Sequence, residues 1–91
     1  NSEAMVEAFK SNDTSTIKKY VNGRIKAKVK NGMTQDNAVF GIRTSITNMY
    51  KEKYIKGNAD EKAKIITIMT KTGVYGSRTD VISYIKKYWL K

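Results

Sequence analysis

Residues 14–30 read TSTIKKYVNGRIKAKVK, and this stretch decides the fold. Its apolar side chains recur at every fourth position, which predicts a helix with an apolar stripe about 120° wide: Ile17, Val21, Ile25 and Val29. Asp13 or Thr14 can cap the start of this helix, and Asn31 with Gly32 can end it. We therefore expect a helix of almost five turns that packs its stripe against the rest of the chain.

Helical spacing and end signals predict four more helices, at about 2–10, 34–56, 58–72 and 77–89. Two of them open with capping boxes, one from Asn58 to Glu61 and one from Ser77 to Asp80. The chain has no proline to break a helix. We predict an all-α fold, a compact bundle of four to five helices joined by short turns. The broad apolar face of the last helix marks it as the central packing element.

The length of 91 residues predicts a single helical domain over 1–91. The chain starts at Asn1 rather than at methionine, so we expect it to be a fragment of a longer protein. Its longest apolar run is too short to cross a bilayer, and no signal-peptide layout opens the chain. We expect no membrane partner.

Composition argues against catalysis and against bound metal. The chain has no cysteine and no histidine, so neither disulfides nor thiolate or imidazole ligands are available. Five of the eight acids fall in predicted first helical turns, where they complement the helix dipole. We therefore predict that the chain is not an enzyme, and that it has no metal, no cofactor and no small-molecule substrate.

The net charge is +10, and residues 14–31 carry six basic residues and no acid. On a helical wheel Lys19, Lys26 and Lys30 fall within about 40° of one another, opposite the apolar stripe. Lys18, Arg24 and Lys28 flank the stripe. The candidate nucleic-acid-binding residues are Lys18, Lys19, Lys26, Lys28 and Lys30, because a one-sign face can follow phosphates. The alternative is that these lysines only solubilise the helix.

A helix-turn-helix reading of residues 65–89 is a further alternative. The turn at 71–74 is similar to that of bacterial repressors, and Arg78 would open the recognition helix. However, the motif needs a buried β-branched residue six positions after Gly73, and that position is the polar Thr79. The first apolar residue, Val81, comes two positions later, so a plain helical hairpin is favoured. The aromatic residues that follow, Tyr84, Tyr88 and Trp89, are expected in the core rather than on a binding surface, with Tyr75 folded over the helix pair.

A dispersed set of residues resembles a helical module near the ends of uncharacterised structural proteins of phages and prophages of Firmicutes. The set covers about residues 8–90 and comprises 42–47 (IRTSIT), Tyr50-Lys51, 54–57 (YIKG), Lys64-Ile65, 72–77 (TGVYGS), Asp80-Val81 and Trp89. The resemblance implies no activity, cofactor or site. It implies a module of protein assembly, with a cytoplasmic or virion-associated location.

Two functions therefore stay open. The first is assembly with a protein partner or with a second copy, through an exposed face of the first helix that carries Met5 and Phe9. The second is binding of nucleic acid, without sequence preference, through the basic helix.

Overall fold

The computed structural model describes residues 2–91, and this part of the chain forms helices and no strand. The helices are α1 (Ser2–Lys10), α2 (Thr14–Lys30), α3 (Gln35–Lys56), α4 (Ala59–Thr72) and α5 (Arg78–Tyr88). Connections of two to five residues join them. The all-α prediction is confirmed, and each predicted helix is present to within a residue or two of its expected ends.

Local side-chain bonds account for the helix boundaries. The Asp13 carboxylate, rather than Thr14, caps α2 by accepting from the backbone N–H of Thr16 at 2.9 Å. Thr34 caps α3 in the same way. The two capping boxes form as predicted, one at the start of α4 and one at the start of α5. Such bonds satisfy the backbone donors that have no partner in the first turn of a helix.

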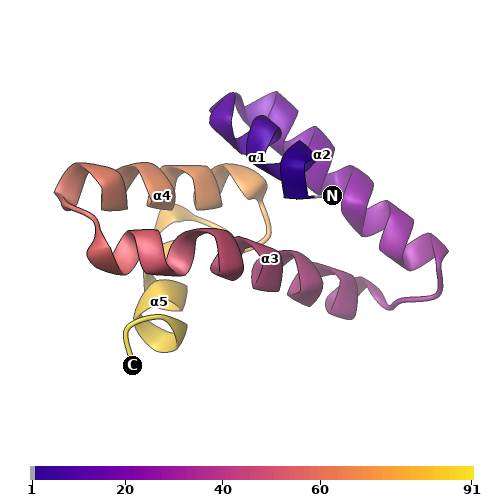
Figure 1. Cartoon of the computed structure of the whole chain (residues 1–91). Coiled ribbons are helices and arrows are strands. Elements are labelled where there is room, and N and C mark those ends of the chain that lie inside the picture. The colour runs from indigo at the N-terminus through magenta and orange to yellow at the C-terminus, as the bar shows by residue number, and fades with distance from the viewer. Residues whose placement is uncertain (1) are drawn as a thin grey trace.

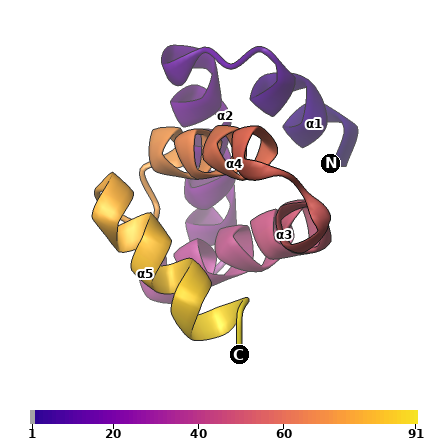
Figure 2. The ribbon, with the colours of Figure 1, turned by 90° about the vertical axis from the view of Figure 1, so that its left-hand side faces the viewer.

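Two helices each contact three others: α4 contacts α2, α3 and α5, and α2 contacts α1, α3 and α4 (Figures 1 and 2). The prediction that α5 is the central packing element is wrong. One face of α5 reaches the core, through Val81, Ile85 and the following Trp89. Tyr88 remains 48% exposed. The rest of the apolar surface of α5 is only partly covered, with Ile82 and Tyr84 half-buried against the core.

The apolar stripe of α2 is buried over most of its length. Ile17, Val21 and Ile25 are in the core, as predicted, whereas Val29 is 40% exposed. Residues four apart advance by about 40° around a helix at each step, so the stripe turns away from a straight partner. The C-terminal part of α2 also runs beyond α4 (Figure 1). Both effects leave Val29 at the edge of the core.

Candidate nucleic-acid interface

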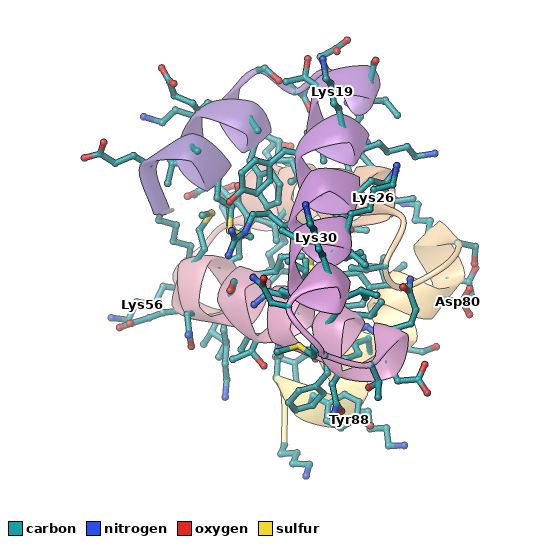
Figure 3. All side chains as sticks on the ribbon, turned by 90° about the vertical axis from the view of Figure 1, so that its right-hand side faces the viewer. Lys19, Lys26, Lys30, Lys56, Asp80 and Tyr88 are labelled. Atoms are coloured by element: carbon teal, nitrogen blue, oxygen red, sulfur yellow. The ribbon has the colours of Figure 1, made fainter. Side chains whose placement is uncertain are left out.

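The outward face of α2 carries three exposed lysines in one line. Lys19, Lys26 and Lys30 all project away from the bundle (Figure 3). Because α2 packs its opposite face against α1, α3 and α4, this lysine face is left in water. At a rise of about 1.5 Å per residue, the line from Lys19 to Lys30 is about 16 Å long.

None of these three lysines forms an ion pair with an acidic side chain of the described residues, although Glu7 of α1 lines the same hollow as Lys19. Within residues 2–91 the only ion pair joins Lys56 to Glu52 at 2.7 Å, both on α3. Asp13, the acid next to α2 in the sequence, is engaged in capping. Hydrogen bonds from the side chain and backbone of Thr16 hold the pKa of Asp13 below its ordinary value. The outer face of α2 therefore carries positive charge along its whole length.

The other two predicted lysines lie on different sides of α2. Lys18 points toward α4, where its Cε lies 3.9 Å from the position that a Cβ would take on Gly73. Lys28 points toward α3 and lies across Gly41, which leaves it half-buried. The structure thus brings together three of the five candidate residues. On the helical wheel Lys18 and Lys28 lie beside the apolar stripe. Lys18 therefore points toward α4 and Lys28 toward α3, the helices that pack on those sides of α2.

Lys28 and Arg24 share a cavity of about 490 Å³ between α1, α2 and α3. Met5, Ile42 and Met49 form part of its apolar wall. Sequence reasoning missed this grouping, because the wall comes from helices whose packing the α2 sequence does not show.

The candidate protein interface on α1 is contradicted by burial. Met5 is 5% exposed and Phe9 is 1% exposed, so neither offers a surface to a partner. The short connection after Lys10 folds α1 back onto α2, and this places both side chains in the core. The Phe9 ring stacks on Tyr50 of α3, with centroids 6.1 Å apart. The two residues are structural.

The connection between α4 and α5 spans residues 73–77. It is longer than the three- or four-residue turn of a helix-turn-helix, which agrees with a plain helical hairpin. Arg43 of α3 holds this connection in place, because its Nε and Nη2 donate to the Val74 carbonyl at 2.8 and 2.6 Å. The Arg43 guanidinium also lies 5.5 Å from the centre of the Tyr75 ring. Two of its nitrogens are thus engaged within the fold.

Three further observations bear on the kind of site. Among residues 2–91 there is no group of three or more acidic side chains close enough to hold a metal ion. None of the described helices is long and apolar enough to cross a bilayer. Comparisons with known protein families, with curated proteins and with solved structures found no match.

Proposed function

We propose that this domain is a non-catalytic binding module that holds nucleic acid, without sequence preference, through the outer face of α2. The observation that supports this function is the line of Lys19, Lys26 and Lys30, exposed together and unpaired with any acid. A charged face that only solubilises a helix normally mixes lysine with glutamate four residues away. This face contains no glutamate.

The chemistry is electrostatic contact with phosphates. A line about 16 Å long matches about five base pairs at about 3.4 Å each, so the three ammonium groups can engage one strand of a duplex. Lysine ammonium groups act as point charges on flexible stems and do not read base edges in a fixed geometry. Affinity then depends on salt and not on sequence.

The test is the salt dependence of binding to a random duplex. Three phosphate contacts predict that log K falls with log salt at a slope of about −2.7, which is about a 40-fold loss between about 50 and 200 mM. Changing Lys19, Lys26 and Lys30 together to glutamate should abolish the binding. Fluorescence anisotropy of a labelled duplex measures both effects.

A control variant distinguishes the effect of charge on the outer face of α2 from the effect of the net charge of the chain. Lys51, Lys86 and Lys91 are exposed and lie outside α2. Changing these three to glutamate alters net charge by the same amount and should leave most of the binding intact. Equal losses in the two variants, or no binding even at low salt, would rule out an α2 interface.

Protein assembly is the second candidate function. It is favoured by Phe40, which is 67% exposed on α3 although it is large and apolar. This candidate uses a different surface from the α1 face that the structure buries. Protein assembly also agrees with the resemblance to phage and prophage structural modules. On that resemblance we propose a cytoplasmic or virion-associated location.

A further inference from the structure

A second cavity lies between α1, α3 and α4, away from the outer face of α2. Its volume is about 570 Å³. Four half-buried apolar or aromatic side chains form much of its wall and present carbon surface to it: Val6, Met49, Tyr50 and Ile68. The Phe9 ring, stacked on Tyr50, also lines the cavity. Cavities of about 300–1,000 Å³ with apolar walls are typical of small-molecule sites.

Three lysines also line this cavity, one from each helix. Lys10 comes from the end of α1, Lys53 from the last turns of α3, and Lys64 from α4. No acidic residue lines the cavity, and none of the three lysines forms an ion pair within residues 2–91. Exposed charges of one sign around the same cavity attract an anion.

Two uncharged polar residues of the cavity have partners in the fold. The side-chain and backbone oxygens of Asn12 accept from the Lys71 ammonium at 2.9 and 2.8 Å. The Thr67 hydroxyl donates to the Ala63 carbonyl and accepts from Arg78. The three lysines are the charged residues among those that line the cavity, and they offer only positive charge.

From this juxtaposition we propose that the cavity binds a single-chain fatty acid. The acyl chain lies on the wall of Val6, Tyr50 and Ile68, and the carboxylate lies at the opening among the lysines. An inorganic anion would leave the apolar wall unused, and an uncharged chain would leave the lysines unused. A ligand with one apolar chain and one anionic end uses both. The site is a binding site and not a catalytic one.

Titration calorimetry with sodium decanoate, below its micellar concentration, tests the proposal on the whole chain. One decanoate should bind per chain, while decanol and acetate should each bind at least about tenfold more weakly. Methyl NMR should place the ligand, with shifts at Val6 and Ile68 and none at the buried Ile17 of α2. Acetate or decanol binding as well as decanoate would overturn the proposal.

A double variant tests the contribution of the lysines to decanoate binding. Changing Lys53 and Lys64 together to glutamine should weaken decanoate binding at least about fivefold. The matched control changes Lys51 and Lys86 to glutamine; it removes the same charge outside the cavity and should leave the affinity unchanged. Equal affinities in the two double variants would overturn the proposal.

The apolar half can be tested without removing core side chains. Ala63 is exposed and lines the cavity, so Ala63→Trp should fill the space and abolish decanoate binding. Far-UV circular dichroism verifies that this variant is folded. If folded Ala63→Trp binds decanoate as the unchanged chain does, the ligand is elsewhere and the proposal is wrong.

One more variant tests the fatty-acid site independently of the proposed nucleic-acid interface. The variant with glutamate at Lys19, Lys26 and Lys30 should lose duplex binding and keep decanoate binding, because those lysines lie outside the cavity. Loss of decanoate binding in that folded variant would overturn the fatty-acid site while leaving the nucleic-acid interface standing.

Discussion

Tyr75 lies in the connection between α4 and α5, where its ring packs edge-on against Tyr84 with centroids 4.7 Å apart. Its hydroxyl is buried and has no hydrogen-bond partner within the described residues. Burial raises the pKa of Tyr75 well above its ordinary value of 10.0; Tyr84 adds to the rise and Arg43 opposes it. The sequence predicted a ring folded over the helix pair, and the ring in fact packs between α5 and an arginine of α3.

The buried hydroxyl makes stability sensitive to alkali. Above about pH 10 the unfolded chain releases the Tyr75 proton while the folded chain retains it, so the free energy of unfolding falls by up to about 1.4 kcal/mol per pH unit. Tyr75→Phe should remove this component. It should also raise stability at neutral pH by about 1 kcal/mol, because an unsatisfied buried hydroxyl is removed.

Urea unfolding at neutral pH and above pH 10 measures both effects. The exposed Tyr88 provides the control, since Tyr88→Phe should change neither quantity. The same alkaline loss in Tyr75→Phe and in the unchanged chain would contradict the assignment, because other titrating groups are common to both.

At the scale of the element, two glycines have different surroundings, one inside a helix and one in a connection between helices. Gly23 lies inside α2, and a Cβ there would meet nothing within 4 Å. Gly76 lies just before α5 with φ +112°, and a Cβ there would collide with the Asp80 carboxylate. That carboxylate accepts from the Ser77 backbone N–H in the capping box, at 2.8 Å. The two positions therefore respond in opposite directions to the same change.

Gly23→Ala should stabilise the fold by about 0.5–1 kcal/mol, because alanine loses less backbone entropy in a helix. Gly76→Ala should destabilise it by about 2–3 kcal/mol, through backbone strain and loss of the cap. Chemical denaturation monitored by circular dichroism gives both values. A change of the same sign in the two variants would show that the connection does not have the described geometry.

For the whole molecule, the exposed apolar side chains bear on whether the domain is monomeric or associates with itself. Phe40 and Ile55 are both on α3 and are 67% and 47% exposed. If the domain associates with itself through Phe40, static light scattering at high concentration should give a mass above 10.3 kDa. Phe40→Ser should then return the mass to one chain, and Ile55→Ser should not.

A mass of one chain at every concentration would contradict self-association through Phe40. The same scattering experiment with the duplex present separates the two candidate functions, since nucleic-acid binding through α2 leaves Phe40 free. Assembly through Phe40 and binding through α2 are therefore measured independently.

Sequence alone was sufficient for the fold class, the helix ends and the outer face of α2. These features depend on interactions between residues three or four apart, such as the Asn58–Glu61 box. The same spacing places Lys19, Lys26 and Lys30 on one side of a helix. Local spacing is visible in a single sequence, so these predictions needed no knowledge of the neighbouring helices.

Tertiary packing alone decided which apolar faces are buried and which cations share a site. Met5 and Phe9 became core residues because α1 folds back onto α2, and α2 and α4, rather than α5, each contact three other helices. The cavity lysines come from three helices at positions 10, 53 and 64, which no local period connects. Contacts between distant segments depend on how whole helices pack, and that information is spread over the entire chain.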